Sequence, residues 1–323
     1  MPKLVLIDGS SYLYRAFHAL PPLTAADGTP TGALFGIVNM LKSSLKENAE
    51  YIGFVLDAPG PTFRDALYPE YKANRAAMPD DLRAQVEPMM AIVQALGLPV
   101  IRVPGVEADD VIGTFAVQAA KDGVDVVIST GDKDFAQLVG PHIKLTNTMT
   151  GSVSDEQRVL EKFGVRPDQI VDYLALMGDA VDNVKGVEKC GPKTAAKWLA
   201  EFETLDAVIA HADAITGKIG ENLRAALPIL PLNRTLVTIK TDVALDRDYT
   251  QLLQLPPHTE DLTALYTRFG FRQALKELQG AAVPLDPKPA IQAAAPVAQA
   301  PVRMPAAAQG VYEAVLEWAA FDA

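Results

Sequence analysis

The sequence has one cysteine and four histidines among 323 residues. A single thiol cannot form a disulfide within the chain, and it excludes a zinc site made of several cysteines. The four histidines, His18, His142, His211 and His258, are scattered without the spacing of metal ligands. We therefore expect neither an intramolecular disulfide nor a metal centre built from cysteines or histidines.

Long apolar runs are also missing. No stretch approaches the roughly 20 apolar residues that a membrane-spanning helix needs. Only four apolar residues, Leu4 to Ile7, come before the first acidic residue, which is too few for a signal peptide. We expect a protein with no membrane partner, located in the cytoplasm.

Basic residues are fewer than acidic ones. The chain has 29 Lys and Arg residues and 40 Asp and Glu residues, which gives a formal net charge of −11. This balance argues against a protein that holds nucleic acid by bulk basicity. It does not exclude nucleic acid, because bound divalent cations would invert the local field. With 49% hydrophobic residues, the chain can bury a core in one large domain or two ordinary ones.

Acidic residues are abundant and fall in short clusters, several of them just after an apolar run. Such runs predict buried strands, and ligands of an open α/β sheet bind beyond the carboxyl ends of its strands. We therefore expect one crevice that collects nine carboxylates: Asp8, Asp57, Glu107, Asp109, Asp110, Asp132, Asp134, Asp179 and Asp182.

So many like charges cannot share a crevice without cations. Mg²⁺ takes one or two carboxylates and keeps several waters, and two ions about 3.5–4 Å apart suit phosphodiester hydrolysis. Each cluster taken alone has an ordinary alternative: Asp8 as a helix cap, Asp109 and Asp110 as first-turn acids, and Asp179 and Asp182 as loop acids. Together the clusters favour a multi-metal site for phosphate chemistry.

Strand-like and helix-like segments alternate through residues 1–150, which predicts a mostly parallel sheet. We expect a helix from Asp80 through Leu96 and a fifth strand at Ile143 to Leu145. From about Ser154 the strands stop and helices follow. Ala281 to Gln309 is rich in Ala and Pro and has the composition of a linker, after which a new amphipathic pattern begins. We expect a fragment of something longer.

Basic residues occur where nucleic acid could be held. A turn at Gly191 and Pro192 should open a helix whose N–H groups can bind phosphate. Lys185, Lys189, Lys193 and Lys197 recur every four residues around it. The alternative is a packing unit with solvated lysines.

Three further segments carry cations or an aromatic ring. Tyr71 could stack on unpaired bases beside Lys72 and Arg75, or the segment could be an exposed charged loop. Arg15 and Arg64 should lie near the crevice. Each could clamp a phosphate or pair with the surplus carboxylates.

Over roughly residues 3–280 the chain resembles the 5′-nuclease (flap endonuclease) family, most closely the N-terminal 5′→3′ exonuclease domain of the bacterial DNA polymerase I group. The motifs that carry the resemblance occur in family order: Leu6 to Ala16, Thr62 to Asp65, Tyr71 to Arg75, Met78 to Arg83, Gly105 to Gly113, Ser129 to Asp134 and Ala175 to Asn183.

The resemblance implies a PIN-like α/β core with a C-terminal all-helical helix–turn–helix DNA-binding subdomain. Residues 1–180 would form the core with a helical arch at about 62–83, residues 181–280 the helical subdomain, 281–310 a linker and 311–323 the start of a truncated domain. Asp8, Asp57, Glu107, Asp109 and Asp110 would hold one metal ion. Asp132, Asp134, Asp179 and Asp182 would hold the second.

It also implies catalytic roles for Lys72, Arg75, Arg64 and Arg15, and DNA contacts by Tyr71, Lys189, Gly191, Lys193, Thr194 and Lys197. The cofactors would be two Mg²⁺ ions, with Mn²⁺ as an alternative, and some relatives hold K⁺ at the helix–turn–helix. Here Glu188-Lys189-Cys190 departs from the family's loop, which is richer in Gly and Pro.

The expected activity is cleavage of 5′ flaps and of nicked and gapped duplex DNA, in primer removal and repair, by a monomer whose full-length chain also carries a polymerase domain. No polymerase activity is expected from these residues. Two alternatives remain, a non-catalytic DNA-binding module and a phosphatase with an aspartyl nucleophile. The phosphatase would need a second Asp two residues after Asp8, where Ser10 stands.

Overall fold

A computed structural model describes residues 2–47 and 49–280, and these belong to one compact unit. The linker and the further domain expected at 281–323 lie outside the described residues. Within the described part, no helix combines the length and the apolar character needed to cross a membrane.

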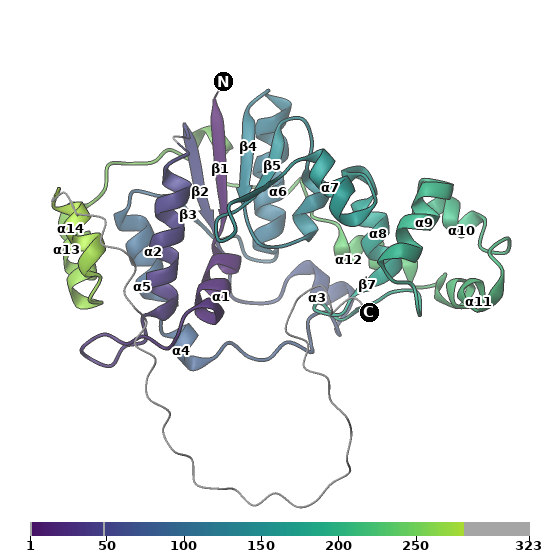
Figure 1. The fold of residues 1–323 in the computed structure, drawn as a ribbon, viewed down its shortest axis with the longest axis horizontal. Coiled ribbons are helices and arrows are strands. Elements are labelled where there is room, and N and C mark those ends of the chain that lie inside the picture. The colour runs from purple at the N-terminus through teal and green to yellow at the C-terminus, as the bar shows by residue number, and fades with distance from the viewer. Residues whose placement is uncertain (1, 48, 281–323) are drawn as a thin grey trace, which may run out of the picture. The chain divides into compact units, whose positions relative to one another are not determined.

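A six-stranded sheet forms the centre of the fold, in the order β3-β2-β1-β4-β5-β6 (Figure 1). All neighbours pair in parallel except β5 and β6, which form an antiparallel edge. This confirms the predicted mostly parallel sheet. The strands are β1 (Lys3–Asp8), β2 (Tyr51–Val55), β3 (Val100–Ile101), β4 (Asp125–Ser129), β5 (Ile143–Asn147) and β6 (Ser152–Ser154).

Helices cover both faces of the sheet, because successive side chains of a strand point to opposite sides. In β1, Val5 and Ile7 enter one hydrophobic cluster while Leu4 and Leu6 enter the other. The Val5 face is covered by α1 (Gly9–Ala19), α2 (Gly32–Leu45), α5 (Val86–Ala95), α13 (Thr259–Arg268) and α14 (Arg272–Leu278). The Leu4 face is covered first by α6 (Ala108–Lys121).

The second half is helical, as predicted. Its main helices are α7 (Glu156–Phe163), α8 (Ile170–Met177), α9 (Pro192–Phe202), α10 (Leu205–Ala210), α11 (Gly217–Ala226) and α12 (Leu230–Val237). Short 3₁₀ turns lie at η1 (Asp134–Leu138), η2 (Pro167–Gln169) and η3 (Tyr249–Gln251). The sequence did not predict the β6 edge or the small antiparallel ribbon of β7 (Gly178–Asp179) and β8 (Val184–Lys185).

The chain then returns to the sheet rather than staying with the second-half helices. The N–H of Ile52 in β2 donates to the carbonyl of Leu252 at 2.7 Å, and that of Leu255 donates to the carbonyl of Gly97 at 2.8 Å. Helices α13 and α14 then pack on the α2 and α5 side, where Phe271 lies edge-on to Phe35. Residues up to 278 thus contribute to the sheet core.

The segment expected to form a helical arch is mostly not helical. It contains α3 (Phe63–Leu67), turns through residues 69–75 and an extended stretch before α4 (Asp80–Arg83). The helix predicted from Asp80 through Leu96 is interrupted between α4 and α5, where Gln85 turns inward and its Oε1 accepts the N–H of Leu34. Burial of this polar side chain overrides the continuous helical pattern.

Two glycines allow the β7–β8 ribbon to close. A Cβ on Gly186 would lie 2.1 Å from the carbonyl carbon of Met177 and 2.3 Å from the nitrogen of Gly178. Gly178 itself has φ +74°, which favours glycine. This close backbone approach fixes the turn that carries Asp179 and Asp182.

Gly186→Ala should lower the free energy of unfolding by about 3 kcal/mol, because the new methyl group meets backbone atoms that cannot move aside. Gly191→Ala is the matched control, since no heavy atom lies within 4 Å of its Cβ position. Chemical denaturation of both variants checks this. Equal stabilities would contradict the packing argument.

Candidate functional site

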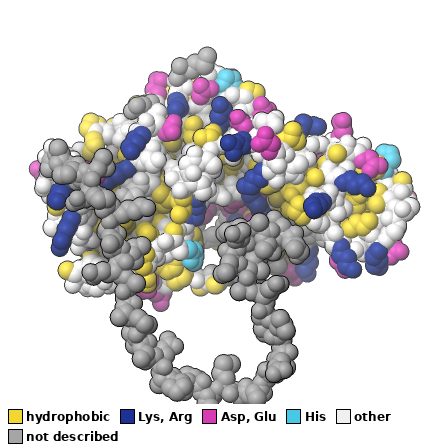
Figure 2. Space-filling view, in the orientation of Figure 1, with side chains coloured by type: hydrophobic (Ala, Val, Ile, Leu, Met, Phe, Trp, Pro, Cys, Tyr) yellow, Lys and Arg dark blue, Asp and Glu magenta, His cyan; other side chains and the backbone are white. Residues whose placement is uncertain are grey.

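The carboxyl ends of β1, β2 and β4 and the start of α6 surround a crevice of about 600 Å³. Figure 2 shows a hollow in this central part of the molecule. Its lining includes five of the predicted carboxylates, from Asp8, Asp57, Glu107, Asp109 and Asp132, together with Arg15, Lys72, Arg75, Tyr14 and His18. These five acids therefore lie together at the strand ends, as the sequence pattern predicted.

Asp8 is buried at the end of β1 and is held by two hydrogen bonds. Its Oδ1 accepts the N–H of Ser11 at 2.9 Å, and its Oδ2 accepts the hydroxyl of Thr130 at 2.6 Å. Burial raises the pKa of Asp8 to about 7, although these bonds oppose the rise, and the charges of Asp132 and Asp57 add to it. Asp8 also caps α1, so the helix-cap alternative and the crevice location are both realised.

Asp109 stands among like charges in the first turn of α6. Burial raises its pKa well above the usual range, and Asp8, Asp132, Glu107 and Asp57 raise it further. Among the described residues it accepts no hydrogen bond from a side chain or N–H. An ionised Asp109 is therefore unfavourable here unless a cation joins it.

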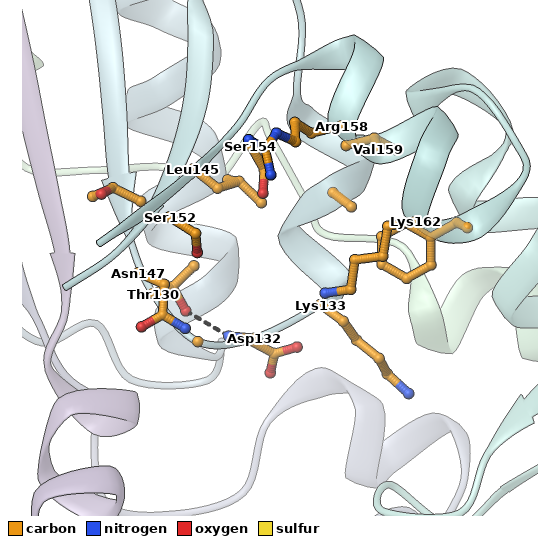
Figure 3. Close-up of a pocket in the computed structure, with 14 residues that line it drawn as sticks. Thr130, Asp132, Lys133, Leu145, Asn147, Ser152, Ser154, Arg158, Val159 and Lys162 are labelled. Carbon is orange, nitrogen blue, oxygen red and sulfur yellow. Dashed lines mark hydrogen bonds between the residues drawn. The ribbon is translucent and has the colours of Figure 1, made fainter. Parts of the chain in front are cut away.

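The remaining acids form a second group beside the first. Burial, and then the charge of Asp132, raise the pKa of Asp134 to about 8, and its buried Oδ1 has no hydrogen-bond partner among the described residues. Burial would also raise the pKa of Asp179, but the hydrogen bond and charge of Lys133 outweigh it and lower the pKa. Figure 3 shows Lys133 on the loop just after Asp132.

These residues fit divalent cations. All the donors are carboxylate oxygens, which Mg²⁺ prefers, and the buried Oδ1 of Asp134 is an unfilled acceptor. In the described part of the chain, no three Asp, Glu, His or Cys side chains lie close enough to enclose one ion by themselves. This agrees with an ion that takes one or two carboxylates and fills its other positions with water.

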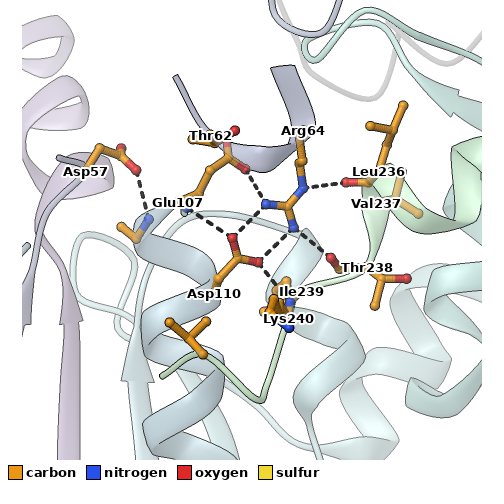
Figure 4. A network of polar contacts seen from close by, with 12 residues as sticks. Asp57, Thr62, Arg64, Glu107, Asp110, Leu236, Val237, Thr238, Ile239 and Lys240 are labelled. Atoms are coloured by element: carbon orange, nitrogen blue, oxygen red, sulfur yellow. Dashed lines mark hydrogen bonds and ion pairs between the residues drawn. The ribbon is translucent and has the colours of Figure 1, made fainter. Parts of the chain in front are cut away.

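Asp110 has a different role from the one predicted, because it is fully buried against Arg64 (Figure 4). Its oxygens accept two bonds from the guanidinium, at 2.7 and 2.8 Å, and the N–H groups of Glu107 and Lys240 at 3.0 and 2.8 Å. These four bonds use the lone pairs that a metal ion would need. The structure thus gives Asp110 a structural role in place of metal binding.

Arg64 is likewise fully engaged. Besides Asp110, its N–H groups reach the carbonyls of Leu236 and Thr238 at 2.8 and 2.7 Å, and Glu107 at 3.2 Å. Four of its five N–H donors thus make hydrogen bonds, and the guanidinium also pairs with Glu107. Of the two alternatives for Arg64, pairing with carboxylates is realised, and clamping of a phosphate is not.

Tyr71 does not offer a stacking surface, because only 5% of it is exposed and its ring belongs to the core. Its hydroxyl donates to Glu107 at 3.1 Å and to Asp182 at 3.0 Å. The prediction that Tyr71 contacts DNA is therefore wrong for this conformation. The apolar residues that bury it are distant in sequence, which local reasoning could not see.

Lys72 and Arg75 reach the crevice from the same segment. Lys72 pairs with Glu107 and lies 3.7 Å from Asp182, which also pairs with Arg75. Burial would lower the pKa of Lys72, but Glu107 and Asp182 outweigh it and raise the pKa. Lys72 and Arg75 thus form ion pairs with two of the predicted metal ligands, Glu107 and Asp182.

Arg15 lines the crevice from α1 and is the cation there with spare donors. Its Nη2 donates to Asn147 at 2.6 Å, while its buried Nη1 has no partner among the described residues. Asn147, Thr130 and Lys133 were not predicted. Lys133 and Thr130 could have been found, since they flank Asp132.

The predicted turn before α9 is present. Gly191 is the N-cap residue, Pro192 begins the helix, and Lys189 adopts φ +63° in the loop. The amide of Asn222 donates to the carbonyl of Glu188 at 2.8 Å, which fixes this loop. The lysine side chains Lys185, Lys189, Lys193 and Lys197 are exposed, and Thr194 is partly buried.

Two family models match the chain. One, described as 5′-3′ exonuclease, N-terminal resolvase-like domain, covers residues 3–164, and the other, 5′-3′ exonuclease, C-terminal SAM fold, covers residues 165–260.

Curated relatives carry corresponding names. A 5′-3′ exonuclease of Aquifex aeolicus is 37% identical, over 86% of this chain and 96% of that protein. DNA polymerase I of Pseudomonas aeruginosa is 54% identical over 85% of this chain, which spans only 31% of that protein.

Solved structures share the fold. The bacteriophage T5 flap endonuclease, in a complex with DNA and metal ions, has a TM-score of 0.62 and 20% identity, covering 86% of this chain and 98% of that chain. The catalytic core of Rad2 with a DNA substrate has a TM-score of 0.58 and 17% identity, covering 86% of this chain and 91% of that chain.

Neighbouring acids in α6 should respond oppositely to removal of charge. Asp110→Asn leaves the buried Arg64 without its partner and should lower the free energy of unfolding by about 3–5 kcal/mol. Asp109→Asn relieves repulsion and should raise the melting temperature of the metal-free protein by about 2–4 °C. Thermal and urea melts in EDTA check both. Shifts of the same sign would contradict the assignment.

Proposed function

Because the chain belongs to the 5′-3′ exonuclease family, we propose that it hydrolyses DNA phosphodiesters at 5′ flaps, nicks and gaps with the help of two divalent ions. Mg²⁺ is the proposed ion and Mn²⁺ its substitute. The biological setting would be primer removal in replication and DNA repair.

The observation that carries this proposal is the crowding of carboxylates in a crevice wide enough for a nucleotide strand. Asp8, Asp57, Glu107, Asp109 and Asp132 line about 600 Å³. Burial and the neighbouring carboxylates raise the pKa values of Asp8 and Asp109, which supports a role for cations beside these two acids. A polyanionic substrate enters such a site only when cations accompany it.

The proposed acidic ligands divide into two groups according to which acids lie near one another. Asp8, Asp57, Glu107 and Asp109 would hold one ion, and Asp132, Asp134, Asp179 and Asp182 the other, with one or two acids of each group binding directly and the rest through water. When bound, such ions supply an activated water and stabilise charge on the attacking and leaving oxygens. Thr130 keeps one oxygen of Asp8 oriented, and Lys133 does so for Asp179.

Cationic side chains would act on the phosphate itself. Arg15 presents an unfilled donor, and Lys72 and Arg75 stand at the rim on Glu107 and Asp182. We propose that the side chains of Lys72 and Arg75 are released when metal ions occupy Glu107 and Asp182, and that they then pair with a substrate phosphate. Arg15 would orient that phosphate. Donors fixed before the reaction stabilise developing charge without reorganisation.

The exposed lysines around α9 would hold duplex DNA by its backbone. The N–H of Lys193 in the first turn and the side chains of Lys189, Lys193 and Lys197 support phosphate contacts, whereas Pro192 has no N–H and those of Thr194 and Ala195 donate to the carbonyl of Gly191. We propose K⁺ binding at the Gly191 turn as a secondary feature. The length of the DNA polymerase I relative supports the proposal that this unit works in one chain with a polymerase. We also propose that the protein acts as a monomer.

Asp8→Ala should abolish cleavage of an end-labelled 5′-flap DNA in Mg²⁺ and leave binding of that DNA within a few-fold of the unaltered protein. The reason is that Asp8 would hold a metal ion and not the DNA itself. Gel analysis of products, with EDTA as the metal-free arm, measures cleavage. Fluorescence anisotropy measures binding.

Asp213→Ala is the control, because Asp213 is an exposed acid between α10 and α11. It should cleave normally. Normal turnover by Asp8→Ala would overturn the site, and unaltered protein that binds the flap but never cuts it would point to a non-catalytic binding module. A trapped phospho-aspartate would point to a phosphatase.

A further inference from the structure

A second, smaller pocket lies between the β5–β6 edge and α7. Its volume is about 70 Å³, and Figure 3 shows side chains from both elements around it. It shares Gly131 and Asp132 with the crevice, so one loop separates the two hollows. Ligand pockets for whole small molecules are roughly 300–1,000 Å³. This pocket is therefore suited to a single group such as a phosphate.

The lining is cationic in a chain of net negative charge. Lys133, Arg158 and Lys162 face one carboxylate, Asp132. Lys133 is engaged with Asp179 at 2.7 Å. Arg158 and Lys162 are exposed, and no ion pair within residues 2–47 and 49–280 includes either of them. Two uncompensated cations thus stand at the pocket.

Local structure holds these two cations on one side of α7. They are four residues apart, so they lie on the same helix face. Asp155 caps the helix by accepting the N–H of Arg158 at 3.0 Å, and Val159 is buried below. The ammonium of Lys162 sits 5.0 Å from the ring centre of Phe163. The fold of α7 therefore fixes the side of the helix from which both cations extend.

The pocket also stands between the crevice and α9. The end of α7 approaches α9, since a Cβ on Gly164 would lie 3.4 Å from that of Ala196. In Figure 2, Lys and Arg side chains gather over the α7 to α9 part of the visible face. A duplex that is held by α9 and cut in the crevice would pass this pocket.

We propose that Arg158 and Lys162 bind a backbone phosphate in the duplex part of the substrate, an inference that rests on the proposed function. Arg158 supplies paired donors and Lys162 a point charge. Serine and asparagine groups of the β5–β6 edge, Ser152, Ser154 and Asn147, line the opposite wall. Single-strand sites stack bases on exposed aromatic rings. Here Phe163 is partly buried against Tyr173, which favours duplex backbone.

Arg158→Ala/Lys162→Ala tests this in the whole chain. Binding of a 5′-flap duplex in EDTA should weaken roughly tenfold, and the slope of log K against log salt should fall by about 1, as expected for the loss of one phosphate contact. Binding of a single-stranded oligonucleotide should not change. Arg272→Ala/Lys276→Ala is the matched control, because these exposed cations have the same spacing on α14, which packs on α13 at the α2 and α5 side of the sheet.

The outcomes separate the two proposals. Arg158→Lys/Lys162→Arg keeps both charges and should restore the salt slope; a purely structural role of the two side chains would not predict this rescue. Unchanged thermal melts of the variants would show that folding is intact. A double-alanine variant that binds the duplex like the unaltered protein would overturn the subsite, and so would equal losses on duplex and single strand. Failure of the unaltered protein to cut any flap would instead overturn the proposed function.

Discussion

The ion pair between Arg64 and Asp110 is the contact on which the crevice depends. It ties α3 to the first turn of α6 and, through the carbonyls of Leu236 and Thr238, to the C-terminal end of α12. Glu107 and Asp109 both lie just before Asp110, and the N–H of Glu107 donates to the Asp110 carboxylate. A buried ion pair of this kind contributes little to stability when intact, but removal of one partner leaves the other as an unpaired buried charge, which is strongly destabilising. The acidic site is thus built on an acid that takes no part in it.

The crevice concentrates negative charge, while the cations lie at its rim or outside it. Lys72, Arg75 and Lys133 cover only some of the carboxylates, and Asp109 stays among like charges. The net charge of −11 therefore comes partly from one small region. The cations on α7 and α9 that we propose to bind the DNA backbone would act on the rest of a nucleic acid without neutralising that region.

Local patterns in the sequence were enough for the sheet, the second-half helices and the strand-end acids. An apolar run followed by Asp is a short-range signal, and it located Asp8, Asp57 and Asp132. The roles of Asp110 and Tyr71 depended on partners far along the chain, such as Lys240 and Asp182. No local signal predicted that residues 252–278 return to the sheet. The amphipathic patterns of α13 and α14 indicate helices but do not specify which part of the protein covers their apolar faces. Spatial relations between distant segments were what the sequence could not supply.

The placement of β1 and α14 has a consequence for how the protein is made. β1 is synthesised first, yet it pairs with β4 at Lys3 and Asp125, and its helical cover is completed by residues near 278. Pairings between distant segments fold slowly, because a long loop must close before they form. The acidic edge therefore cannot take its final shape on the ribosome until nearly all of this unit has emerged. The acids proposed as metal ligands come together only when translation of the unit is almost complete.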